Sequence, residues 1–489
     1  AYRRQRQMCI RDSSLGLTVI ANLRCGAWYT NPEWLESTSY FKSTDGHMHQ
    51  WDFSMKRANL HLIPLIQPRH QQQPQDDEAS VDQAGSGATT ELTGCVLIDS
   101  TRRGKRYPDA LSKTVPIWCA VLNRASHRTF GTPSDPPPLQ IPTDTVSLSE
   151  AAQIEARLDM WVHKFCASDL AVPCLEKPLC PVFVHAPHIP TLPTCAMQHH
   201  IVLVSVSPCE APKAFHTMHA SYVQGAGDDH EAWAHGLTPA LFWRHHRELL
   251  APHLQREDRV NLVHKLVREE RERSGQVPWL ATDNSATRID STCLFIAARP
   301  LAHSFSHHER SRYAFIVHCS QSEREPSTTP ATQQQPCASE TPPVLRLGID
   351  ASKRGLGSFS RALPLVVDAV TDALIWETRN KEHPRGVLVC CSDGCQLSGA
   401  VAVAILAASY DRHRQFLGTG TDAHQKLTKH RKRISKDDTQ RRLQWITGSV
   451  HSVSQTSPSR AHLQRVNAYL MGPLPVSYTH LRAHETRGN

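Results

Sequence analysis

The sequence contains no long hydrophobic run. Across its 489 residues no apolar stretch reaches the roughly 18 that a membrane crossing needs, and the mean hydropathy is −0.42. These features exclude a transmembrane helix. The charged first residues have no apolar segment behind them, so we expect neither a secretory signal peptide nor a membrane partner.

Cysteine is too sparse for a disulfide scaffold. The 15 cysteines include no C-x-x-C pair, which argues against a zinc ribbon or a thioredoxin motif. Most of these thiols are therefore expected to be reduced and structural, which indicates an intracellular, cytoplasmic protein. The net charge of +8 permits a polyanionic partner but does not require one.

Changes in composition divide the chain into two units. The polar segment 320–343 is the clearest linker, so we predict an N-terminal domain at 14–319 and a C-terminal domain at 344–475. Polar stretches at about 67–93 and 418–436 are predicted insertions, the first disordered and the second flexible and basic. The segments 1–13 and 476–489 resemble translated sequencing adapter, and we expect them to be non-native.

Apolar periodicity predicts an α+β N-terminal domain and an α/β C-terminal domain. Ser147 followed by Glu150 indicates a capping box, and Ser457 before Pro458 indicates a second N-cap. Strands are predicted at Cys95–Ile98, Ile201–Val206, Val344–Ile349 and Val387–Cys391. Helices are predicted at Leu148–Phe165, Trp243–Glu272, Arg361–Leu374, Leu397–Tyr410 and Pro458–Met471.

A candidate anion-binding loop follows the strand Val387–Cys391. Strand, Gly-containing loop and helix N-terminus place backbone N–H groups around an anion, here at Cys391, Ser392, Asp393 and Gly394. The segment resembles the phosphate loop of dual-specificity phosphatases, but Leu397 stands where those enzymes carry an Arg. We therefore expect no phosphatase activity. The loop either binds phosphate without cleaving it or is a plain strand–turn–helix.

Two N-terminal segments are dense in polar chemistry. The first supplies a cation, two hydroxyls, a carboxylate, a glycine and an imidazole in consecutive positions: Lys42, Ser43, Thr44, Asp45, Gly46 and His47. The second begins where the strand Cys95–Ile98 ends, and its hydroxyls and cations suit a phosphate-rich ligand, although a basic run can also be a solvated surface. Its residues are Asp99, Ser100, Thr101, Arg102, Arg103, Gly104, Lys105 and Arg106.

A third segment combines a flexible loop with paired carboxylates. Gln224, Gly225 and Gly227 form the loop, and Asp228 and Asp229 follow it. Such a pair suits Mg²⁺ held together with substrate phosphates. It equally suits the N-terminus of an acidic helix.

Together these motifs resemble the initiator tRNA phosphoribosyltransferases of fungi and plants. The similarity runs through NLRCGAWY (22–29), YFKSTDGH (40–47), DSTRRGKRYPDALSKTVPIWCAVLN (99–123), YVQGAGDDHE (222–231) and SPSRAHLQRVNAYLM (457–471). The resemblance implies a catalytic N-terminal domain and a C-terminal domain like a dual-specificity phosphatase. It also implies transfer of a 5-phosphoribosyl group from phosphoribosyl pyrophosphate to the 2′-hydroxyl of adenosine 64 of initiator methionine tRNA.

This reaction assigns roles to the polar residues. Phosphates are expected to bind Arg102, Arg103, Lys105 and Lys113, supported by Arg24 and Lys42. Asp99 or Asp45 is the predicted base, with His47 next, and Asp228 and Asp229 are candidates for Mg²⁺ or ribose. The basic tracts 426–436, 244–246 and 268–273 are candidate contacts for tRNA phosphates. We expect a monomer. The alternatives are a catalytically inactive tRNA- or phosphate-binding relative and a phosphatase.

Overall fold

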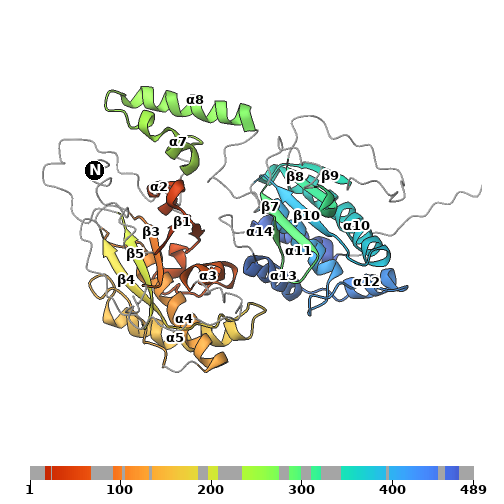
Figure 1. Ribbon diagram of the computed structural model, residues 1–489, viewed down its shortest axis with the longest axis horizontal. Helices are drawn as coiled ribbons and strands as arrows, with labels where there is room; N and C mark the ends of the chain where they lie inside the picture. The colour runs from red at the N-terminus through yellow and green to blue at the C-terminus, as the bar shows by residue number, and fades with distance from the viewer. Residues whose placement is uncertain are drawn as a thin grey trace, which may run out of the picture.

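The structure is a computed structural model of the chain. It describes residues 17–23, 25–67, 92–101, 105–131, 135–185, 197–206, 234–274, 286–298, 310–320, 343–392, 396–449 and 458–472. These residues form two α/β units, each built around its own sheet (Figure 1).

The first unit contains a five-stranded parallel sheet in the order β2-β1-β3-β5-β4. The strands are β1 (Thr18–Asn22), β2 (Ser37–Ser39), β3 (Gly94–Asp99), β4 (Leu179–His185) and β5 (His199–Ser205). Every residue of β3 and β5 is buried, which explains their near-continuous apolar sequences. The predicted strands at Cys95–Ile98 and Ile201–Val206 are therefore confirmed, each within two residues of its observed ends.

Two long helices, α4 (Val115–Phe130) and α5 (Leu148–Cys166), cover one face of this sheet. Trp118, Trp161 and Phe165 pack into the shared core, and burial of each large apolar side chain contributes about 1.5–3 kcal/mol. Ser147 caps α5 by accepting a hydrogen bond from the Glu150 N–H at 3.1 Å. The predicted start of this helix is thus confirmed.

Short helical turns connect the first three strands and lead from β3 into α4. They are α2 (Gly26–Tyr29), η2 (Pro32–Trp34), η3 (Ser43–Gly46), η4 (Met55–Arg57), η5 (Leu60–Leu62), α3 (Ile63–Ile66) and the π-helical η6 (Ala110–Thr114). Farther along the chain, α7 (Pro239–Leu249) and α8 (Arg256–Ser274) replace the single helix predicted at Trp243–Glu272. That prediction was wrong because Pro252 lies inside the continuous charged pattern and the helix ends before it.

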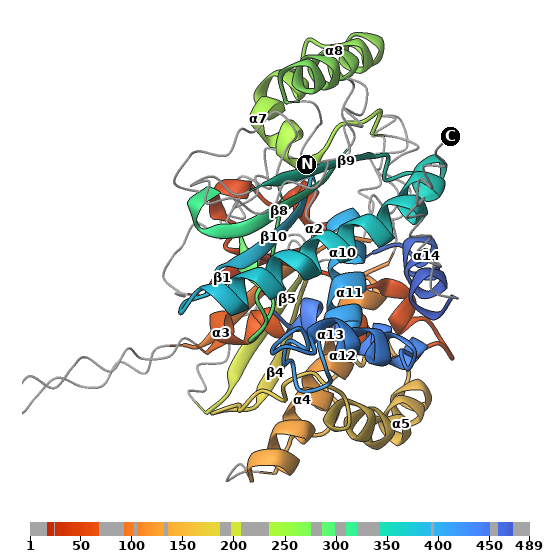
Figure 2. The ribbon, with the colours of Figure 1, turned by 90° about the vertical axis from the view of Figure 1, so that its right-hand side faces the viewer.

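The second unit has a five-stranded sheet in the order β6-β7-β10-β8-β9. Figure 2 shows its neighbouring strands β10, β8 and β9. Its strands are β6 (Thr287–Arg288), β7 (Leu294–Ala298), β8 (Tyr313–Ser320), β9 (Val344–Ile349) and β10 (Gly386–Cys391). Only β6 runs antiparallel to its neighbour among these described pairs. The helices are η8 (Lys353–Gly355), α10 (Leu356–Asn380), α11 (Leu397–Ser409), α12 (Ala423–Arg431), α13 (Lys436–Ser449) and α14 (Arg460–Met471).

Three boundary predictions need correction. The segment 320–343 does not separate the two sheets, because β7 and β8 precede it and pair with β10. This polar segment connects the parallel strands β8 and β9. The predicted insertion 418–436 contains the helix α12. The N-cap of α14 is Ser459 and not the predicted Ser457, and the Ser459 hydroxyl accepts a hydrogen bond from His462 N at 3.3 Å.

The two units meet at Asp169. Its carboxylate accepts a hydrogen bond from the Trp445 indole at 3.0 Å and pairs with Arg441 at 3.4 Å, while Arg414 donates to its carbonyl at 3.3 Å. Helix α13 also lies against η4 and η5. Within the described part of the chain, no helix combines the length and apolarity that a membrane crossing requires.

Candidate functional site

The carboxyl end of β3 presents a buried, oriented carboxylate. Asp99 is 2% exposed, and its Oδ2 accepts a hydrogen bond from Asn22 Nδ2 at 2.7 Å. Its Oδ1 accepts from the Ser100 N–H at 2.8 Å. Asn22, at the end of β1, also binds the backbone N–H and carbonyl of Phe41, each at 2.9 Å. One amide therefore fixes Asp99 and the start of the segment that carries Lys42–His47.

Helix α2 approaches this strand end closely enough to require glycine. A Cβ on Gly26 would lie 2.0 Å from the Ile98 carbonyl oxygen. The close approach brings Tyr29 to Ser100, and burial raises the pKa of Tyr29 although a hydrogen bond with Ser100 opposes that shift. The hydroxyl groups of Tyr29 and Ser100 thus face each other beside Asp99.

A network of opposite charges lies at the next turn, η6. Asp109 Oδ2 pairs with Lys105 at 2.8 Å, and its Oδ1 pairs with Lys113 at 3.0 Å. Lys113 Nζ also binds Glu150 Oε1 at 3.0 Å, and Trp51 Nε1 donates to that same oxygen at 3.1 Å. Burial raises the pKa of Asp109, but the two lysines outweigh it, so the pKa lies below its ordinary value.

His47 is the exposed member of the network. Its Nε2 lies 3.7 Å from Asp109 Oδ2, and its side chain is 46% exposed. The glycine before it allows η3 to pack on η6, because a Cβ on Gly46 would lie 2.6 Å from the Asp109 carbonyl oxygen. An exposed imidazole backed by a carboxylate is an arrangement suited to accepting a proton.

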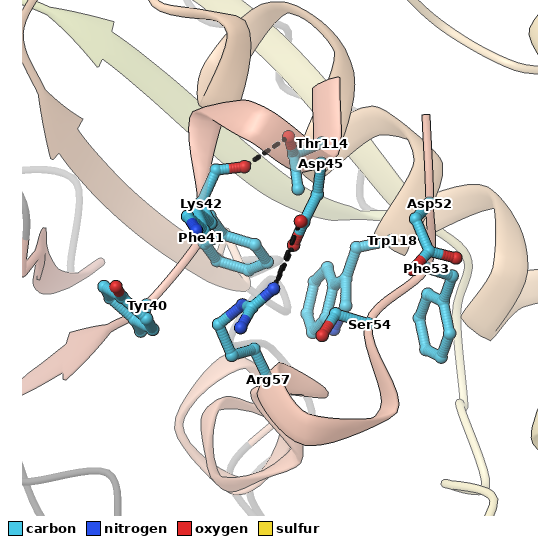
Figure 3. A pocket seen from close by; sticks show the side chains of 10 residues that line it. All are labelled: Tyr40, Phe41, Lys42, Asp45, Asp52, Phe53, Ser54, Arg57, Thr114 and Trp118. Carbon is cyan, nitrogen blue, oxygen red and sulfur yellow. Dashed lines mark hydrogen bonds and ion pairs between the residues drawn. The ribbon is translucent and has the colours of Figure 1, made fainter. Parts of the chain in front are cut away.

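Asp45 faces a separate pocket of about 240 Å³, open solvent at its mouth included (Figure 3). Arg57 holds its carboxylate with contacts of 2.8 and 3.1 Å. Burial raises the pKa of Asp52, on the same pocket, and the negative charge of Asp45 raises it further. Thr114 Oγ1 donates to the Lys42 carbonyl at 3.2 Å and ties this pocket to η6.

The structure brings together part of the predicted set. Asp99, Ser100 and Thr101 lie at the end of β3, and Lys42, Ser43, Thr44, Asp45 and His47 lie on and beside η3, next to Lys105 and Lys113. Lys113 is buried between two carboxylates, so it is not a freely available phosphate ligand. Eleven predicted residues lie outside the described residues: Arg24, Arg102, Arg103, Gly104, Gln224, Gly225, Gly227, Asp228, Asp229, Asp393 and Gly394.

Sequence reasoning missed three residues of this site: Asn22, Asp109 and Glu150. A signal existed for Asp109, because it lies four residues after Lys105 and four before Lys113, the spacing of neighbours on a helix. Glu150 was assigned only to the helix cap, yet its carboxylate binds Lys113 and Trp51. No local sequence pattern indicates Asn22, since its hydrogen-bond partners Phe41 and Asp99 lie 19 and 77 residues away.

The last residue of β10 carries a buried thiol. Cys391 is 1% exposed, and its Sγ contacts Ser398 Oγ at 3.0 Å and the Ser398 N–H at 3.4 Å. Leu397, where the phosphatase loop has Arg, is itself buried at the start of α11. Ser392 is half-buried beside it. The arrangement retains the strand–loop–helix frame without the guanidinium that would clamp a phosphate.

No group of three or more His, Cys, Asp or Glu side chains suited to a metal occurs among the described residues. Carboxylates of the site instead bind protein groups: Asp99 binds Asn22, Asp45 binds Arg57, and Asp109 binds two lysines. Asp228 and Asp229, the predicted metal ligands, lie outside the described residues.

Comparison with known proteins places the chain in a family. The model described as the Rit1 N-terminal domain matches residues 8–268, and the Rit1 DUSP-like domain matches residues 343–470. The Saccharomyces cerevisiae tRNA A64-2′-O-ribosylphosphate transferase is 28% identical over 494 residues, covering 93% of this chain and 87% of that protein. An uncharacterized Schizosaccharomyces pombe protein is 29% identical over 466 residues, covering 92% of this chain and 88% of its own.

Phosphatases are among the solved structures that resemble part of the chain. The Yvh1 phosphatase domain of Chaetomium thermophilum is 17% identical, with a TM-score of 0.26, and covers 38% of this chain and 95% of its own. PTPMT1 is 14% identical, with a TM-score of 0.23, and covers 38% of this chain and 94% of its own. The family models carry the assignment, since the first alone spans more than half of the residues. The chain belongs to the Rit1 family.

Proposed function

We propose that this protein transfers a 5-phosphoribosyl group from phosphoribosyl pyrophosphate to the 2′-hydroxyl of adenosine 64 in initiator methionine tRNA. The proposal is supported by membership of the Rit1 family and by the name of the Saccharomyces cerevisiae relative, a tRNA A64-2′-O-ribosylphosphate transferase. The observation that carries it is the site at the carboxyl end of β3, where hydroxyls, cations and an exposed imidazole meet.

The donor would bind at this strand end. Parallel α/β sheets place their ligands outside the carboxyl ends of the strands, and here Ser100, Thr101 and Lys105 follow β3. Arg102 and Arg103 continue the same loop and complete the proposed phosphate site. Mg²⁺ would enter bound to the pyrophosphate of the donor, as part of the substrate.

Of the three candidate bases, His47 has the most suitable surroundings. Asp45 is held by Arg57, and Asp99 is buried and accepts two hydrogen bonds, whereas the His47 ring is nearly half-exposed. In the proposed step the 2′-oxygen forms a bond to the anomeric carbon, the bond to pyrophosphate breaks, and His47 takes the hydroxyl proton. Asp109 orients the ring and stabilises its protonated form.

Lys105 links donor binding to this base. It is 28% exposed and shares Asp109 Oδ2 with His47, whereas Lys113 binds the other oxygen from a buried position. A donor phosphate that draws Lys105 away would leave Oδ2 to the imidazole. Lys113 would continue to hold Asp109 in place.

A transfer assay tests the proposal. The protein is incubated with initiator tRNA, Mg²⁺ and donor labelled in its 5-phosphate; label in the tRNA is the expected result. Binding of tRNA without transfer would indicate an inactive relative, and release of inorganic phosphate would indicate a phosphatase.

Two neighbouring histidines provide a matched pair of variants. His47→Asn should lower kcat at least 100-fold and abolish the acidic limb of the pH profile, because the proton acceptor is lost. His49→Asn should leave kcat within about twofold, since His49 is exposed, lies against the Trp51 ring and has a φ of 64° that Asn tolerates. Equal activity of the two variants would eliminate His47 as the base.

A further inference from the structure

Helix α12 and the turn after it form an exposed cationic surface at the outer edge of the second unit (Figure 1). Residues 423–436 contain six Lys and Arg and no Asp or Glu. One of them, Arg431, turns inward to the Tyr469 ring at 4.3 Å and to Asp368 at 4.0 Å. The other five are exposed: Lys426, Lys429, Lys432, Arg433 and Lys436.

The opposite face of α12 anchors it to the fold. Ala423 and Ile434 are buried, and His430 Nε2 lies 3.0 Å from the Ala407 carbonyl oxygen of α11. Lys426 and Lys429 are three residues apart and so share the outer face of α12, and Lys432 and Arg433 follow in the exposed turn after it. The cations are therefore displayed together by a fixed element.

These five cations form no ion pair within the part of the chain that the structure describes. The polar contact of Lys426 is with the Thr419 carbonyl, at 3.4 Å. On other helices some basic side chains do have acidic partners, as Lys265 has Glu269 and Arg124 has Glu155 and Asp159. Like charges three and four residues apart repel, so a polyanion on this face would relieve a repulsion that the protein leaves uncompensated.

The chemistry of the outer face favours nucleic acid over a lipid surface. Between the cations the exposed side chains are His424, Gln425 and Thr428, and none is a large apolar group that would insert among acyl chains. Exposed cations grouped on a helix and the turn after it suit the repeated phosphates of an RNA backbone, which they would bind without reading sequence.

We infer that the surface formed by α12 and residues 432–436, with Lys426, Lys429, Lys432 and Arg433 at its centre, is a docking site for the phosphate backbone of the tRNA. The inference rests on the proposed function and extends it, since it assigns part of substrate binding to the phosphatase-like unit. The site contributes affinity and salt dependence and takes no part in the chemical step.

The test compares two variants that lose the same charge. One carries Ala at Lys426, Lys429, Lys432 and Arg433; the control carries Ala at four exposed arginines elsewhere, Arg128, Arg354, Arg412 and Arg465. For the α12 variant we expect a KM for tRNA at least tenfold higher and kcat within about twofold. A plot of log affinity against log salt should become shallower by roughly 0.9 for each tRNA phosphate that the variant no longer neutralises. The control should match the native protein in all three measurements.

Transfer by the native protein shows that the proposed function holds, whatever α12 does. An unchanged KM and salt slope in the α12 variant, or the same weakening in the control, would overturn the docking site. Sedimentation of the native protein with phosphatidylserine vesicles, abolished in the α12 variant while tRNA binding persists, would overturn it in favour of a membrane surface.

Discussion

Replacing Lys113 with Met should destabilise the first unit strongly. The ammonium group is 9% exposed and lies 3.0 Å from both Asp109 and Glu150, so its removal leaves two carboxylates facing each other without their shared cation. Breaking a buried ion pair by removing one partner costs about 3–5 kcal/mol, and Lys105 can compensate only at Asp109. We expect a destabilisation near the lower end of that range.

Urea unfolding followed by tryptophan fluorescence measures this destabilisation, and Trp51 reports locally because its indole donates to Glu150. Lys105→Met is the matched control: Lys105 has one partner and greater exposure, so its removal should cost about 0–1 kcal/mol. Glu150→Gln combined with Lys113→Met should recover part of the stability, since it removes one of the unpaired charges. A Lys113→Met cost no larger than that of Lys105→Met would refute the reasoning.

Three further predictions concern other parts of the fold. Asp169→Ala removes the acceptor of the Trp445 indole and should weaken the joint between the units by about 2 kcal/mol, seen as a larger radius of gyration in X-ray scattering. Burial lowers the pKa of His199 from 6.5 to about 4, so the neutral imidazole stabilises the fold fully above pH 6.5. About 3 kcal/mol of the free energy of unfolding should be lost as the pH falls toward 4. In urea titrations, His199→Gln should flatten this pH dependence. Gly26→Ala should lower Tm, with a cost of about 1–3 kcal/mol, because the new methyl group meets the Ile98 carbonyl.

Strands and helices with strong local patterns were predictable from the sequence. The strands β3, β5 and β10 are fully buried runs of mainly apolar residues, and α5 carries both helical periodicity and a Ser cap, so local preference and tertiary burial agree. The extent of the second sheet was not predictable in this way. Its strands β7 and β8 lie before a polar segment of the kind that usually ends a domain, and only pairing with β10 shows where they belong.

The candidate site was likewise predictable only in part. The hydroxyls and cations after β3 are adjacent in sequence, so their chemistry was predictable from the run itself. What each side chain does depends on partners brought together by the fold: Lys105 and Lys113 both follow β3 in the sequence, yet Lys113 is buried between Asp109 and Glu150 while Lys105 remains at the surface. The same distinction applies to His47, which ranked below two carboxylates on sequence grounds because its proximity to Asp109, 62 residues away, is created only by the packing of η3 on η6. Burial therefore distinguishes the side chains that maintain the structure of this site from those that are available to a substrate. Composition alone does not make this distinction.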